Sequence, residues 1–366
     1  MPRSLSKKEI EEVIYGATLL GAGGGGSLPD GLRLLSEVTR DKEVKLEMVD
    51  PEEMDANEYA VTVAGIGAPK VLKEKNFGPE ALYAFDAMKN VAFFAGKDIK
   101  YVMAGEIGGF NAMVPMYVAM LKNIPFVNGD GNGRAVPELS TGLYPTYDIP
   151  PTPLVLAGRD GNVIIAYLKD PRDNASAENI ARHISIAYGM SAAFSTWIVN
   201  KNDIVEKLAP KSIDKCQLIG AAILKAKKEN LSVVGEITKV VKCKELFQGT
   251  IKDIKIKTEG GFDFGTTVLA GTGKFKGEVC EIDFKNENLL ARNGQGQVIA
   301  TVPDMIGLLD LDKKEPLTNA ETEKGLNIAV IGIPAPDNWW KKPEGFTCWK
   351  HILTKVGYNG GPVRVL

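Results

Sequence analysis

The sequence contains little histidine and little cysteine. Its 366 residues include two histidines, His183 and His351, and four cysteines that form no C-x-x-C pair. Scattered cysteines exclude a disulfide framework and a zinc-ribbon pattern, so we expect reduced, mostly structural thiols. Two histidines cannot supply the H-x-H pair and the further ligands of a histidine-rich dinuclear metal centre. They also leave a Ser-His-Asp triad only two candidate bases.

The chain also lacks an excess of charge and any long apolar run. Its net charge is −2 at pH 7, which leaves no basic footprint for a nucleic-acid partner. No apolar run reaches the length of a bilayer span, and the first residues lack the apolar core of a signal peptide. We therefore expect a cytoplasmic protein with no nucleic-acid or membrane partner. We also expect a homo-oligomer, because soluble enzymes commonly form closed symmetric assemblies.

Apolar segments alternate with helical patterns in the first part of the chain. The helical patterns cover residues 79–94 and 111–122. The strand-like segments are 44–49, 59–66, 101–105 and 124–127. This alternation predicts an α/β sheet domain over residues 1–166, in which "RDGN" at 159–162 forms a hairpin turn.

The second part of the chain has a different pattern. Helical segments at 176–193 and 214–228 precede a series of short alternating strands over 232–302, the first of them at 233–243. We expect residues 167–366 to form a β-rich α+β domain. Its tail, rich in tryptophan, is a candidate to pack back on the first domain and to seal an interface or floor a pocket.

A glycine run, "GAGGGG" at 21–26, stands between two helical patterns. Gly21, Gly23 and Gly26 fit G-x-G-x-x-G, but a dinucleotide site needs a strand before this motif, so we expect no nicotinamide or flavin. Bare backbone near a helix start favours an anion, such as a carboxylate or an oxyanion. The alternative is a tight corner between two helices.

Two neighbouring turns carry most of the polar residues that are candidates for catalysis or binding. In "GEIGGFNAMVP" and "NGDGNGRAVPEL", Glu106 and Asp130 each follow an apolar run. At adjacent strand ends, the two carboxylates could share a metal or divide acid and base roles. Arg134 could hold a substrate carboxylate. In the alternative interpretation, Asp130 caps a loop and Arg134 only neutralises it.

The remaining candidates lie outside these turns. His183 is the best imidazole for a base or a ligand, although a lone helical histidine is more often structural. Asp304 either faces the cleft from the second domain or caps a following helix. The candidate catalytic residues, which are also the candidate ligands of a divalent metal, are Glu106, Asp130 and His183. The candidate substrate-binding residues are Gly23, Gly24, Gly25, Gly26, Asn111, Asn132, Arg134, Glu138 and Asp304.

Six stretches together resemble the S-methyl thiohydantoin desulfurase domain family. They are "GAGGGG", "GEIGGFNAMVP", "NGDGNGRAVPEL", "ENLLAR", "VPDMIGLLD" and "GIPAPDNW". The resemblance implies an N-terminal α/β domain, a smaller C-terminal domain richer in strand, and hydrolytic attack on a five-membered cyclic ureide or thiohydantoin ring. One position departs from the family pattern, since Asn128 stands where an Asp is expected.

Three hypotheses follow for function. The first is a hydrolase of a small hydantoin-like or thiohydantoin-like molecule, in which Glu106 or Asp130 acts as base or binds a metal that activates water. The second is a non-catalytic, metabolite-binding partner of an oxoprolinase-type enzyme. The third, a nucleotide-binding oxidoreductase, rests on the glycine motif alone.

Overall fold

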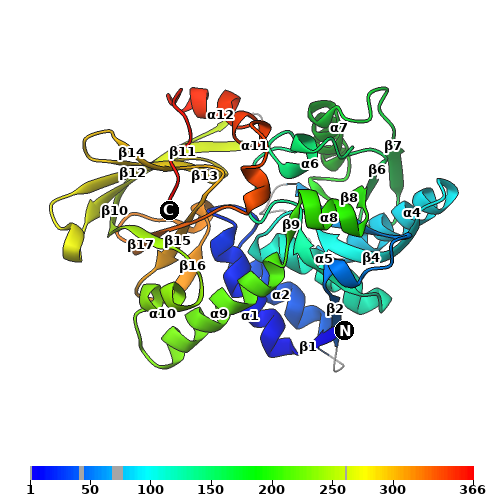
Figure 1. Cartoon of the computed structure of the whole chain (residues 1–366), viewed down its shortest axis with the longest axis horizontal. Coiled ribbons are helices and arrows are strands. Elements are labelled where there is room, and N and C mark those ends of the chain that lie inside the picture. The colour runs from blue at the N-terminus through cyan, green and yellow to red at the C-terminus, as the bar shows by residue number, and fades with distance from the viewer. Residues whose placement is uncertain (1, 41–44, 68–76, 260–261) are drawn as a thin grey trace.

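Two β-sheets lie side by side, with helices packed around and between them (Figure 1). The computed structural model describes residues 2–40, 45–67, 77–259 and 262–366. The predicted architecture is confirmed, since an N-terminal α/β unit is followed by a β-rich one. In the described part of the chain, no helix has the length and apolar character needed to cross a membrane.

The first sheet is mixed and has nine strands within the described residues. Its strand order is β1–β2–β5–β4–β3–β8–β6–β7, with β9 beside β5. The strands β2, β5, β4 and β3 are parallel, and the flanking strands are antiparallel to their neighbours. The bounds are β1 (Arg3–Leu5), β2 (Leu46–Val49), β3 (Glu58–Gly67), β4 (Asp98–Ala104), β5 (Phe126–Asp130), β6 (Leu154–Ala157), β7 (Val163–Ala166), β8 (Ser191–Val199) and β9 (Ala209–Pro210).

The second sheet is antiparallel and has eight strands, in the order β14–β13–β12–β11–β10–β17–β15–β16, among the residues described. It occupies the left of Figure 1. The bounds are β10 (Lys244–Glu259), β11 (Phe262–Gly271), β12 (Val279–Lys285), β13 (Glu287–Asn293), β14 (Val298–Thr301), β15 (Met305–Asp310), β16 (Glu315–Leu317) and β17 (Asn327–Ile333).

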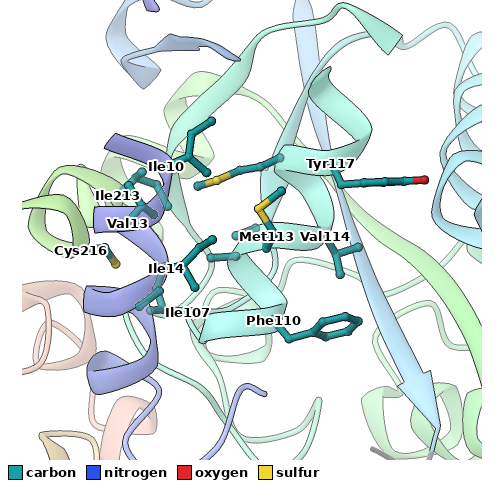
Figure 2. Close-up of a cluster of buried hydrophobic side chains, with 14 of the residues drawn as sticks. Ile10, Val13, Ile14, Ile107, Phe110, Met113, Val114, Tyr117, Ile213 and Cys216 are labelled. Carbon is teal, nitrogen blue, oxygen red and sulfur yellow. The ribbon is translucent and has the colours of Figure 1, made fainter. Parts of the chain in front are cut away.

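The helices α1, α5 and α9 form the apolar centre of the molecule (Figure 2). Ile10 and Ile14 of α1 face Met113 of α5, and Cys216 of α9 lies on the other side of α1. The helix bounds are α1 (Lys7–Leu20), α2 (Leu28–Val38), α4 (Pro79–Phe94), α5 (Gly109–Lys122), α6 (Leu143–Thr146), α7 (Asn174–Ala187), α8 (Lys201–Lys207), α9 (Ser212–Lys228), α10 (Val233–Val240), α11 (Glu344–Thr347) and α12 (Lys350–Lys355). This buried contact fixes the glycine run, which joins α1 to α2, against the first sheet.

Two local predictions are wrong. Most of the expected strand at 233–243 is the helix α10, because the side chain of Ser232 accepts the N–H of Gly235 and caps a helical first turn. The helix expected at 176–193 ends at Ala187. Gly189 and Met190 then adopt positive φ angles of 70° and 62°, which turn the chain into β8.

The chain crosses between the two units more than once. The strands β8 and β9 follow residue 166 in sequence, yet both complete the first sheet. The predicted boundary between residues 166 and 167 therefore does not separate the two sheets. The tail then returns to the first unit, where Nε1 of Trp339 donates to the carbonyl of Asn132 at 2.7 Å.

Candidate functional site

A pocket of about 130 Å³ lies where β3 and β4 end. Its walls come from these strand ends, from the loop after β5, from α7 and from β8. This is the edge of an α/β sheet at which ligands usually bind. The charged and amide side chains that line it are Glu106, Asn111, Asn132, Glu138, Glu178 and Arg182.

Glu106 contributes a carboxyl group with a strongly perturbed environment. It follows β4 by two residues, and its Oε1 accepts a hydrogen bond from Nδ2 of Asn111 at 2.6 Å. Its Oε2 accepts the backbone N–H of Val136 at 2.7 Å. Burial and the nearby charge of Glu287 raise the pKa of Glu106 well above its ordinary value. This environment favours the protonated acid.

Glu138 contributes a second carboxyl group with opposite surroundings. Its Oε1 forms an ion pair with Nζ of Lys285, at the end of β12. Its Oε2 lies 2.8 Å from Nε2 of His351, and Ser140 Oγ donates to the same oxygen at 3.1 Å. Burial lowers the pKa of His351, so the neutral ring makes this contact as the Nε2–H tautomer. The cation and the donors favour the ionised carboxylate of Glu138.

Lys285 is itself an unusual cation, because its side chain is only 2% exposed. Burial, with a contribution from Lys355, lowers the pKa of Lys285 to about 8, and the charge of Glu287 opposes this shift. Its Nζ lies 3.8 Å from the ring centre of Phe262. The guanidinium of Arg182 lies 4.1 Å from the centre of the same ring. The second sheet thus contacts two pocket-lining side chains, Arg182 through Phe262 and Glu138 through Lys285.

Glu178 holds the loop that carries Glu138. Its Oε2 accepts the backbone N–H of Leu139 at 3.0 Å, and its Oε1 pairs with Arg182 at 2.7 Å. Glu178 and Arg182 both belong to α7, so the hydrogen bond to Leu139 joins the loop to this helix. Glu178 is therefore committed to protein contacts.

Comparisons with known proteins place the chain in a family. The model of the S-Me-THD-like N-terminal domain matches residues 8–167, and that of the S-Me-THD-like C-terminal domain matches residues 172–361. The chain belongs to the S-Me-THD-like family. The resemblance noted from the sequence motifs is confirmed.

One solved structure shows how far this S-Me-THD-like fold extends. A crystal structure of a protein from Chromobacterium violaceum, from a structural genomics consortium, aligns with a TM-score of 0.84 and 23% identity. The alignment covers 99% of this chain and 100% of that one, and it supports the fold alone. None of the curated proteins matches the chain.

In this S-Me-THD-like chain, the glycine run holds a carboxylate that belongs to the protein itself. A Cβ on Gly24 would lie 1.9 Å from Oε1 of Glu287, and the backbone N–H of Gly25 bonds to that carboxylate. Gly25 has a φ of +73°, and a Cβ there would lie 2.6 Å from the Cα of Gly108. None of the four predicted substrate contacts, Gly23, Gly24, Gly25 and Gly26, lines the pocket.

Asp130 and Arg134 are fully buried behind the pocket and do not line it. Asp130 accepts the backbone N–H of Asn132 at 2.7 Å and that of Gly133 at 2.8 Å, which shapes the turn. Burial raises its pKa to about 7. The guanidinium of Arg134 donates to the carbonyls of Ala135, Pro303, Asp304 and Asn288. These bonds leave Arg134 facing the backbone of the protein, away from any substrate in the pocket.

The other predicted residues have different outcomes. Asn111 and Asn132 line the pocket, as Glu138 does. Asp304 does not line it, because its two carboxylate oxygens accept the N–H groups of Ala335 and Val365, each at 2.8 Å.

His183 does not join Glu106 and Asp130. It is exposed on α7, and its Nδ1 lies 2.8 Å from the carbonyl of Asn179. In the described residues, no three His, Cys, Asp or Glu side chains form a group that could hold a metal. The structure therefore does not gather the three predicted ligands, because the side chain of His183 faces solvent.

Asn128, the position that departs from the family pattern, is also absent from the pocket lining. Its Nδ2 donates to Asp50 at 2.7 Å and to Asp214 at 2.8 Å. An Asp at this position would place a third carboxylate between two others, so the amide is the side chain that these neighbours accommodate.

Sequence reasoning missed four residues of this site. Lys285 and Trp197 lie in the strands β12 and β8, at positions that belong to none of the motifs noted in the sequence. Glu287 begins the "ENLLAR" stretch, which the sequence marked only through the family resemblance. His351 is one of only two histidines, and that scarcity was the signal that could have identified it.

Proposed function

We propose that this chain is a hydrolase of a small cyclic ureide or thiohydantoin-like ring, with Glu106 as general acid and Glu138 as general base. The observation that supports this proposal is a pair of carboxyl groups in one pocket with opposite electrostatic surroundings. Environments that separate two carboxyl groups in this way are typical of acid and base partners.

The reaction follows from these two roles. Glu138 accepts a proton from water, whose oxygen bonds to the amide-type or thioimidate-type carbon of the ring. The bond from that carbon to sulfur or to ring nitrogen then breaks, and Glu106 gives its proton to the departing atom. The proton that Glu138 took from water then passes to Glu106 through solvent, which restores both groups, so a thioimidate and water become a carbonyl compound and a thiol with no other reactant. The amide of Asn111 keeps Glu106 in place through its 2.6 Å hydrogen bond.

The size of the pocket also supports a small substrate. Its volume of about 130 Å³ is below the roughly 300–1,000 Å³ typical of sites for drug-sized ligands. A single five-membered ring is therefore a better candidate than a dinucleotide. The S-Me-THD-like family membership supports the same ring class.

A direct assay tests the proposal. The purified protein is incubated with S-methyl thiohydantoin, 2-thiohydantoin and hydantoin, and released thiol or sulfide and ring-opened product are quantified. We expect turnover of at least one ring, and loss of it in E106Q and in E138Q. E278Q, which changes an exposed glutamate, is the control. No turnover of any of the three rings by folded protein would contradict the proposal. The homo-oligomer, the cytoplasmic location and an oxoprolinase-type partner stay predictions.

A further inference from the structure

Trp197 lies in an irregular part of β8, beside the pocket. In the pairing of β3 with β8, Val61 lies opposite Ile198 and Thr62 opposite Thr196, so the register skips Trp197. Trp197 has a φ of +49°, a left-handed backbone that a bulky residue rarely adopts. Bulges of this kind often redirect a side chain next to a functional site.

The indole of Trp197 forms part of the pocket wall. The ring of Tyr144 stacks on it in parallel, with the ring centres 3.9 Å apart and the planes 1° apart. Tyr144 is fixed in turn, because Gly131 approaches it so closely that a Cβ there would lie 2.2 Å from Cε2. One face of the indole is thus covered by Tyr144, and the side chain also borders the pocket.

The indole N–H supplies a second, independent observation. Trp197 is only 5% exposed, and among the described residues its Nε1 has no hydrogen-bond partner. Buried N–H groups are nearly always paired, so an unpaired one at a pocket wall indicates a missing acceptor. The neighbouring pocket-lining carboxyl, Glu106, accepts its hydrogen bonds from Asn111 and Val136 instead.

We propose that Trp197 is a specificity-determining residue that binds the planar ring of the substrate. Its indole packs against the ring. Its N–H donates a hydrogen bond to the oxygen of a ring carbonyl or to the sulfur of a ring thiocarbonyl. This inference rests on the proposed function for the class of ring. Trp197 binds the ring and takes no part in proton transfer. The strained backbone of the bulge serves to present the indole to the pocket.

Calorimetric titration with 2-thiohydantoin and hydantoin tests this assignment. W197F keeps an aromatic ring but loses the N–H, and we expect its Kd to rise about threefold to tenfold. W197A also loses the stacking surface, and we expect a further rise of about fivefold. Trp340 provides the control, since it lies under Arg364 in the tail and does not line the pocket. W340F should bind both rings as the wild type does.

Tryptophan fluorescence adds a readout that a purely structural role would not change. Ring binding should quench emission in the wild type and in W340F, and the quench should disappear in W197F. An unchanged Kd and quench in W197F, with an unchanged melting temperature, would overturn the assignment. Binding without turnover would leave the ring site in place and contradict only the hydrolase. Absence of any binding by the folded wild type would overturn both.

Discussion

The Nζ of Lys285 on β12 contacts Oε1 of Glu138, and this ion pair fastens a pocket residue of the first unit to the second sheet. The lysine side chain is 2% exposed and the glutamate side chain 16% exposed. Because the pair is largely shielded from water, the two charges interact more strongly than a surface pair would. The position of Glu138, one of the carboxyl groups that line the pocket, therefore depends on both units.

The first prediction concerns this ion pair. K285M should lower the free energy of unfolding by about 2–3 kcal/mol. This loss is somewhat smaller than that caused by removing one partner of a fully buried ion pair, because Glu138 stays in contact with the pocket. The double variant K285M/E138Q should lose less than the sum of the two single variants, since Gln leaves no unpaired charge. Urea unfolding of the four proteins measures the coupling. Strict additivity would show that the pair contributes no interaction energy.

The second prediction concerns the general acid. E106Q should lower kcat by about 100-fold to 10,000-fold with little change in KM, because Gln fills the same space but has no acidic proton. Steady-state kinetics on the ring that the wild type turns over measures both constants. A variant with wild-type kcat would exclude Glu106 as the proton donor.

The third prediction concerns the pH dependence of turnover. Glu106 acts in its protonated form, so kcat should fall as pH rises through its raised pKa. The charge of Glu287 helps to raise that pKa, and E287Q removes the charge. We therefore expect the descending limb of the kcat profile to shift to lower pH in E287Q. The exposed-site control E278Q should keep the wild-type profile, and a limb that does not move in E287Q would refute this coupling.

The fourth prediction concerns stability and Asp130. Burial raises the pKa of Asp130 to about 7 from an ordinary 3.8, so the folded chain keeps a proton that the unfolded chain releases. The contribution to stability is complete below about pH 4 and is lost as pH rises to about 7. D130N should flatten this decline in urea unfolding between pH 4.5 and 7.

Asp253 provides the matched control for this experiment. The ion pair with Lys324 lowers the pKa of Asp253, so its contribution is lost only as pH falls below the measured range. D253N should keep the slope of the wild type. A wild-type slope in D130N as well would mean that Asp130 does not titrate in this window.

The fifth prediction concerns the glycine run. G24A should destabilise the fold by about 1–3 kcal/mol, because its Cβ would fall 1.9 Å from Oε1 of Glu287. G361A introduces the same methyl group where no atom lies within 4 Å of it, and we expect a change close to zero. The melting temperatures of both variants, measured by thermal unfolding, are compared with that of the wild type. Equal melting temperatures would show that Glu287 moves aside without cost.

Local sequence patterns determined much of the fold. The helical pattern over residues 79–94 coincides with α4, and the hairpin at "RDGN" joins β6 to β7. Such features depend on hydrophobic period and turn residues, which act over a few positions. The placement of Glu106 just after a buried strand was equally visible, because strand ends of an α/β sheet face the usual ligand edge.

Tertiary structure alone decided which side chains meet. Glu138 contacts Lys285 across 147 positions of sequence and His351 across 213. Arg134 and Asp130 belong to a motif that the sequence marked, but both side chains are buried. Because buried polar groups need partners, they form hydrogen bonds with the backbone. The glycine run was expected to suit an anionic ligand, and in the structure the N–H of Gly25 bonds to the carboxyl group of Glu287, on a strand of the second sheet. Local pattern carries no information about such distant pairs, since only the packed chain brings them into contact.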